Sequence, residues 1–133
     1  MQKILSICFV ILTFVSCKDE INIPESGSYV DGDPPIISIL SPDKDSTYNS
    51  SQDIPLHITL KDNYNLDSFE LLIRTEFTQD SVLYFDTTIT DSFYTYLSHF
   101  SPLSTDSADY EIFVNAYDEV GNNNNLLITI TAK

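Results

Sequence analysis

Short segments in which every second residue is apolar recur along most of this 133-residue chain. Residues 54–61 are the clearest example, because apolar Leu56, Ile58 and Leu60 alternate with polar His57, Thr59 and Lys61. Successive side chains of a β-strand point to opposite faces of a sheet, so this period of two predicts a strand with one buried face. No segment shows the period of about 3.6 residues that an amphipathic helix requires. The pattern therefore predicts an all-β protein.

Seven segments of this kind are separated by short stretches rich in Pro, Asn, Asp and Ser, which are typical turn residues. The predicted strands are residues 36–40, 54–61, 68–77, 82–85, 93–97, 110–116 and 126–130. In the third of them, the alternation places on one face Phe69, Leu71, Ile73 and Phe77. Short strands with turns at regular intervals predict one seven-stranded antiparallel β-sandwich over residues 34–133.

The N-terminus predicts export and lipid attachment. A basic residue, an apolar run over residues 4–15 and a small residue before Cys17 form the layout of a secretory signal over residues 1–16. The run is shorter than the roughly 20 apolar residues that span a bilayer. Residues 14–17 resemble the bacterial lipobox, and this resemblance implies that Cys17 carries the lipid. An ordinary signal peptide is the alternative, but it would leave Cys17 as a lone thiol in an oxidising compartment once Cys8 is removed.

The residues after the cysteine predict where the protein is displayed. Lys18, Asp19 and Glu20 resemble the export signal that sends Bacteroidetes-type lipoproteins to the outer face of the outer membrane. An acidic linker that begins this way by chance is the alternative. Residues 17–33 otherwise mix acids, Ser, Gly and Pro without periodicity, which predicts a flexible lipidated tether. We therefore expect a lipid-anchored protein of the outer membrane that faces the cell exterior.

The charge of the chain excludes some partners. The sequence has 20 acidic and 6 basic residues and a formal net charge of −14 at pH 7. Such a charge argues against binding to nucleic acid and against lying on an anionic membrane surface. It favours bound cations, although solvation of the surface alone is the simpler explanation.

Three segments, residues 34–42, 60–68 and 110–122, resemble the Ig-like, cadherin-like and fibronectin-like modules of bacterial surface proteins. The first looks like the first strand and turn of such a module, and the other two look like strands followed by its aspartate-containing turns. Asn65 and Gly121 stand where these turns need a left-handed backbone, and Tyr110 stands at the position of a tyrosine corner. The resemblance implies an Ig-like sandwich and, because its motifs are generic, says little about activity.

Oxygen-rich loops suggest a calcium site. The candidate ligands are Asp62, Asp118 and Asn122, which lie in turns that can meet at one end of a sandwich, and Asp31 and Asp33 arrive from the tether. Calcium takes six to eight oxygen ligands, which such loops can supply. The alternative is that Asp62 and Asp118 only cap their own turns, and the sequence favours this alternative because no EF-hand spacing is present.

Aromatic side chains suggest a glycan-binding surface. Five tyrosines are expected to point outward, namely Tyr48, Tyr64, Tyr94, Tyr96 and Tyr117. Flat aromatic faces beside Asp and Asn side chains commonly hold sugar rings. Tyrosine is also a common strand residue for packing reasons alone, and the absence of tryptophan from the sequence favours this second explanation.

Catalytic chemistry has little support in the sequence. His57 lies on the outward face of a predicted strand, and His99 lies near the end of another. The chain has no histidine cluster with zinc-ligand spacing and no glycine-rich phosphate loop. We therefore do not expect an enzyme.

Covalent modification is a further expectation. Four short motifs resemble the three-residue O-glycosylation site of Bacteroidetes-type exported proteins, and their candidate acceptors are Ser46, Ser81, Thr87 and Ser107. Such short motifs also arise by chance in a chain this rich in Asp, Ser and Thr.

Together these features predict a non-enzymatic surface lipoprotein, anchored in the membrane through Cys17. Its Ig-like domain would serve as a spacer or as an interaction module that binds an unidentified protein partner. The alternative is a carbohydrate-binding accessory module of a glycan-uptake system. No cofactor is certain, and calcium is the candidate.

Overall fold

The computed structural model describes residues 31–103 and 106–133, and the secondary structure of this part of the chain consists of strands and turns. The strands are β1 (Ile36–Ser41), β2 (Thr47–Tyr48), β3 (Ile54–Lys61), β4 (Leu66–Thr75), β5 (Ser81–Thr88), β6 (Phe93–Phe100), β7 (Ala108–Asp118) and β8 (Asn123–Ala132). Within residues 31–103 and 106–133, no helix is long and apolar enough to cross a membrane.

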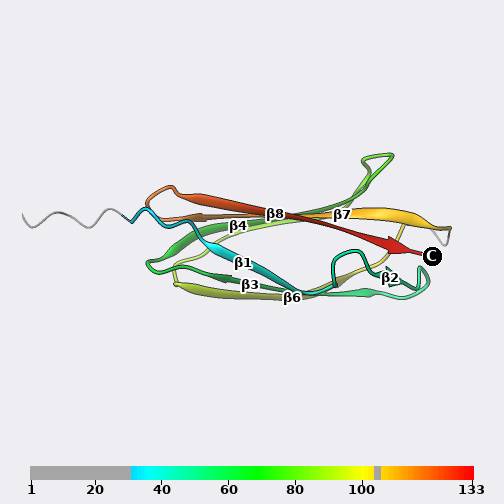
Figure 1. Cartoon of the computed structure of the whole chain (residues 1–133), viewed down its shortest axis with the longest axis horizontal. Helices are drawn as coiled ribbons and strands as arrows, with labels where there is room; N and C mark the ends of the chain where they lie inside the picture. The colour runs from blue at the N-terminus through cyan, green and yellow to red at the C-terminus, as the bar shows by residue number, and fades with distance from the viewer. Residues whose placement is uncertain (1–30, 104–105) are drawn as a thin grey trace, which may run out of the picture.

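The strands form two sheets that face each other, as Figure 1 shows. One sheet has three strands in the order β1-β3-β6, and the other has five strands in the order β2-β8-β7-β4-β5. Every pairing is antiparallel except that of β2 with β8, which is parallel. The predicted all-β sandwich is thus confirmed.

The core lies between the two sheets and follows the alternation in the sequence. Along β3, every second side chain from Ile54 to Leu60 is at most 1% exposed, and the intervening ones are half-buried or exposed. The long central strands β4 and β7 contribute Leu71, Ile73 and Ile112, which are fully buried. Burial of these apolar side chains supplies most of the driving force for folding.

The β2 strand is an addition to the seven predicted strands. It has two residues, Thr47 and Tyr48, which pair with Thr131 and Ala132 of β8. Two residues are too few to show any periodicity, so the sequence gives no signal for this strand. The sequence predicts a wholly antiparallel sandwich, and the parallel pairing of β2 with β8 departs from that prediction.

Two predictions about side-chain direction are wrong. Phe77 is 86% exposed rather than buried, because β4 ends at Thr75 and the turn that follows includes Gln79 at a φ of 60°. Three tyrosines that were expected to point outward pack against the core instead, namely Tyr48, Tyr94 and Tyr96. The ring centroids of Tyr94 and Tyr96 lie 5.8 and 5.5 Å from that of Phe69, so aromatic contacts with the opposite sheet decide the direction of these two side chains.

The expected left-handed turn residues are confirmed at one position. Gly121 has a φ of 93°, which side chains with a Cβ rarely adopt. Asn65 is not among the described residues with a positive φ. Instead, the carbonyl of Asn65 accepts a hydrogen bond from the amide of Glu119, so that the β3–β4 connection is joined to the β7–β8 connection.

The two ends of the sandwich carry different structures. Residues 31–35, the β3–β4 connection and the β7–β8 connection gather at one end, on the left of Figure 1. The turn between β4 and β5, the connection between β6 and β7 and the C-terminus lie at the other end. The end that receives residues 31–35 is therefore the one nearer to the predicted lipid anchor along the chain.

Candidate metal centre

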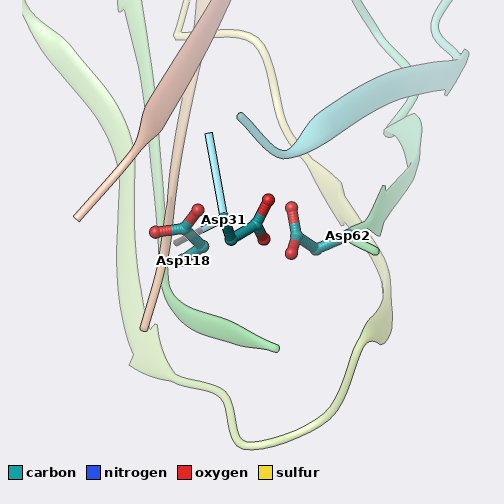
Figure 2. Close-up of side chains that lie close together, drawn as sticks. All are labelled: Asp31, Asp62 and Asp118. Carbon is teal, nitrogen blue, oxygen red and sulfur yellow. The ribbon is translucent and has the colours of Figure 1, made fainter. Parts of the chain in front are cut away.

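Three aspartates from distant parts of the sequence meet at the end that holds residues 31–35. Asp31 precedes β1, Asp62 directly follows β3, and Asp118 is the last residue of β7. One carboxylate oxygen from each lies within 4.8 Å of the others. Figure 2 shows the carboxylate of Asp31 between those of Asp62 and Asp118. We call these three residues the aspartate triad.

Two members of the triad cap their own turns, as the sequence favours. Oδ1 of Asp62 accepts a hydrogen bond of 2.8 Å from the amide of Tyr64. Oδ1 of Asp118 accepts hydrogen bonds from the amides of Val120, at 3.0 Å, and Asn122, at 2.7 Å. These turns fix the backbone on either side of each aspartate, so that both carboxylates are held at the end of a strand.

Asp31 is held in place by asparagines from both connections. Nδ2 of Asn63 donates a hydrogen bond of 3.0 Å to Oδ1 of Asp31, and Nδ2 of Asn122 donates one of 3.0 Å to its backbone carbonyl. The amide of Asp33 also donates to Oδ1 of Asp31, at 3.1 Å. The sequence places Asp31 in a flexible tether, whereas in the structure it is 3% exposed and belongs to the end of the sandwich.

Turn capping does not account for all the oxygens of the triad. Asp31, Asp62 and Asp118 are only 3%, 5% and 2% exposed. Oδ2 of Asp31 and Oδ2 of Asp62 are shielded from solvent and have no hydrogen-bond partner in the described chain. Within residues 31–103 and 106–133, no Lys, Arg or His forms an ion pair with the triad. Buried charges are ordinarily paired or bound to a metal, and these oxygens have no such partner in the described part of the chain.

The electrostatics of the site oppose ionisation of Asp62. Burial raises the pKa of the Asp62 carboxyl above its ordinary value of 3.8, and the negative charges of Asp31, Asp118 and Asp33 raise it further. The hydrogen bond from the Tyr64 amide lowers the pKa and does not offset these effects. A divalent cation between the carboxylates would reverse the balance, because it favours the ionised form of each ligand.

The chemistry of the triad fits calcium. Calcium binds carboxylate oxygens at 2.3–2.6 Å, so two oxygens bound to one ion lie at most about 5.2 Å apart. The spread of the triad oxygens is within this limit. Three carboxylates supply three to six ligands, and water or backbone carbonyls commonly complete the shell. A cavity of about 440 Å³, lined in part by Asp33, Asp62 and Asn63, lies beside the Asp62 member of the triad.

Asn122, one of the expected ligands, lies at the site. Its side-chain amide nitrogen donates hydrogen bonds to Oδ2 of Asp118, at 2.7 Å, and to the Asp31 carbonyl, at 3.0 Å. Asn122 therefore joins two members of the triad. Sequence reasoning named Asp31 only as a neighbour and did not name Asn63, because both come together through contacts that span at least 32 residues of sequence.

The remaining candidate residues lie elsewhere. Ser81 and Ser107 are exposed, whereas Ser46 and Thr87 are half-buried. The hydroxyl of Ser46 donates to the Asp43 carbonyl. The residues of the predicted lipid and export signals, Cys17, Lys18, Asp19 and Glu20, lie outside the described residues.

One Ser, Asp and His grouping forms on the surface. Oδ1 of Asp53 accepts a hydrogen bond of 2.6 Å from Ser101, and its Oδ2 lies 3.6 Å from Nε2 of His99. In a catalytic triad the histidine stands between the serine and the aspartate and takes the serine proton. Here the aspartate stands in the middle, so His99 does not contact the hydroxyl that it would have to activate.

Two tyrosines do present an aromatic surface. Tyr117 is 40% exposed and Tyr84, which the sequence analysis did not name, is 56% exposed. They flank an open groove of about 260 Å³ on the outer face of the five-stranded sheet, lined in part by Glu70 and Asp86. Partial desolvation and the neighbouring carboxylates of Asp86 and Glu70 raise the pKa of the Tyr84 hydroxyl above its ordinary value of 10.0.

Comparison of the sequence with known proteins adds no relative. No protein-family model matches the chain, and no curated protein matches it.

Proposed function

We propose that this protein is a non-enzymatic, lipid-anchored β-sandwich module of the cell surface, and that a calcium ion bound by the aspartate triad stiffens the end nearest its anchor. The module serves as a spacer or presents its surface to a protein partner. The triad carries the part of this proposal that concerns calcium, because three buried carboxylates with two unpartnered oxygens are the arrangement that a divalent cation would satisfy.

The location rests on the sequence of the N-terminus. The predicted signal over residues 1–16 supports export, the lipobox-like residues 14–17 support lipid attachment at Cys17, and Lys18, Asp19 and Glu20 support display on the outer membrane. Calcium is also the divalent cation that extracellular modules bind with modest affinity, so a surface location and a calcium site are compatible.

Calcium titration of the full chain, purified in detergent, tests the proposal through the melting temperature. Binding to the folded state adds about 2.7 kcal/mol at a free calcium concentration about 100 times Kd, which raises the Tm of a domain this small by roughly 10 °C or more. The Asp118→Asn variant should lose this rise, because it removes one of three carboxylates but keeps the side-chain oxygen that caps the turn. Glu76→Gln is the matched control, since Glu76 is an exposed carboxylate in the turn at the opposite end. An equal rise in Asp118→Asn, or no rise in the unaltered chain, would exclude the calcium site.

The alternative function is carbohydrate binding, and the groove between Tyr84 and Tyr117 is the observation that favours it. Tyrosine rings can stack on a sugar, while Glu70 and Asp86 can accept hydrogen bonds from its hydroxyl groups. Affinity electrophoresis of the full chain against neutral polysaccharides would test this reading. Retardation that Tyr84→Ala abolishes would support carbohydrate binding, and unchanged mobility in every gel would argue against it.

A further inference from the structure

The aspartate triad combines two aspartates at the ends of strands with one aspartate in the segment that precedes β1. Asp62 and Asp118 stand at the ends of β3 and β7, and hydrogen bonds to neighbouring strands hold both of these strands along their length. Asp31 instead precedes the first strand by several residues. The described contacts of residues 31–35 with the sandwich therefore decide whether the third carboxylate is present at the site.

Side-chain amides of three asparagines form these contacts. Asn63 donates to Oδ1 of Asp31, Asn122 donates to the Asp31 carbonyl, and Asn124 donates to the Pro35 carbonyl at 2.9 Å. Pro35 is buried as well, but residues 32–34 are exposed, so only a few contacts hold the segment on the sandwich. Without a cation, the negative charge of Asp31 beside Asp62 and Asp118 opposes the same contacts.

We infer that calcium acts as a latch, which locks residues 31–35 onto the sandwich when it binds and leaves them free to detach when it is removed. This inference rests on the proposed calcium site. The ion converts the repulsion among three carboxylates into an attraction to a shared charge, and Asp31 is the ligand that is lost when the segment opens. Because the closed form has three carboxylate ligands and the open form has two, calcium binds the closed form more tightly and shifts the population towards it.

The latch would control how the module is presented. Residues 31–35 join the sandwich to the predicted flexible tether, so a locked segment fixes the point at which the tether leaves the sandwich. A detached segment adds its own length to the tether. The far end, with the β4–β5 turn and the C-terminus, would therefore reach a little further from the anchor without calcium than with it.

Hydrogen–deuterium exchange of the full chain in detergent, with calcium chloride or with chelator, tests the latch at the segment itself. If the segment exchanges only after it opens and the open form does not retain the ion, calcium at about 100 times Kd slows exchange of residues 31–36 by about a hundredfold. The turn at residues 76–80 provides the internal control, because it lies at the opposite end. We expect exchange there to change far less than exchange of residues 31–36.

The Asp31→Asn variant separates the latch from the calcium site. An asparagine keeps an oxygen that can accept from Asn63 and Asp33, but it lacks the charge, so exchange of residues 31–36 should respond to calcium by less than about tenfold. If calcium raises the Tm of the unaltered chain but leaves exchange of residues 31–36 unchanged, the latch is wrong and the calcium site stands. If the turn at 76–80 is slowed as much as residues 31–36, calcium stabilises the whole fold and there is no latch. If calcium neither raises the Tm nor slows exchange, the calcium site is wrong and the latch fails with it.

Discussion

Asp62 illustrates how one side chain can serve two purposes that make different demands. As a turn cap it needs only one oxygen, which accepts the Tyr64 amide. The second oxygen is shielded from solvent and has no partner among the described residues. A cap alone would be equally well served by asparagine, which can accept the same hydrogen bond without a buried charge. The charge at this position therefore needs an explanation beyond the turn.

The Asp62→Asn variant tests that explanation through the pH dependence of stability. Because the folded-state pKa of Asp62 is raised, the folded protein binds this proton more tightly than the unfolded chain, and ionised Asp62 lowers stability at neutral pH. In chelator at pH 7, we expect Asp62→Asn to increase the free energy of unfolding by on the order of 1 kcal/mol. This gain should shrink as the pH falls through the raised pKa towards the ordinary value of 3.8. Urea denaturation from pH 4 to pH 7 measures it.

Calcium should reverse the sign of the effect. The ion favours ionised Asp62, so in calcium at pH 7 the unaltered chain should be the more stable one and Asp62→Asn should lose the benefit. Glu76→Gln should show neither behaviour, because Glu76 is exposed at the other end of the sandwich. A stabilising effect of Asp62→Asn that is equal in calcium and in chelator would contradict the assignment of Asp62 as a ligand.

Residue patterns could predict two aspartates of the triad but not the third. Asp62 and Asp118 were found because each follows a strand and begins a recognisable turn. Asp31 could not be assigned, since its position depends on Asn63 and Asn122, which are 32 and 91 residues away. The unpartnered oxygens arise only when all these segments are in place, and no local pattern encodes them.

Among the strands, alternation predicts the buried face well where the apolar residues all lie on one face of the strand. It predicts the buried face poorly where both faces carry apolar residues. In β3 only one face is apolar, and its inward residues were identified correctly. In β6, Phe93 and Leu97 lie on one face of the strand and Tyr94 and Tyr96 lie on the other, so the sequence alone does not decide which face is buried. The tyrosines turn inward because Phe69 and Phe85 in the opposite sheet offer aromatic partners.

Tyr110 of β7 ties a strand to the connection that precedes it. Its ring is fully buried, and its hydroxyl accepts a hydrogen bond of 3.0 Å from the amide of Leu103, seven residues upstream. This contact has the character of the tyrosine corner that the family resemblance implies. Tyr110→Phe should lower the free energy of unfolding by about 1 kcal/mol, because it removes the acceptor and leaves the core filled. Thermal melting measures the loss, and Tyr117→Phe, at a 40% exposed position, should change stability by less than about 0.5 kcal/mol. Equal losses in both variants would mean that the corner contributes nothing specific.

The protein taken together combines a strongly acidic surface with a predicted attachment to a membrane, and these two properties oppose each other. A formal net charge of −14 repels an anionic lipid surface, so electrostatic attraction cannot retain the chain there. Within the described residues, strands and turns provide no membrane-spanning helix. Retention at the membrane would then rest on covalent lipid, to which each buried methylene contributes about 0.8 kcal/mol.

Replacement of Cys17 tests this dependence directly. In its export host, the unaltered protein should partition into the detergent phase of a phase-separation assay and should have an intact mass above that of residues 17–133. Where the signal is still removed, as an intact mass of residues 17–133 would show, Cys17→Ser should move the protein into the aqueous phase, because no other part of the cleaved chain is expected to hold it against the charge repulsion. Cys8→Ser is the matched control, since Cys8 lies inside the predicted signal and its loss should leave partition and mass of the exported protein unchanged. Detergent partition that survives Cys17→Ser would contradict the lipid anchor. It would also leave the proposed calcium latch without an anchored tether on which to act.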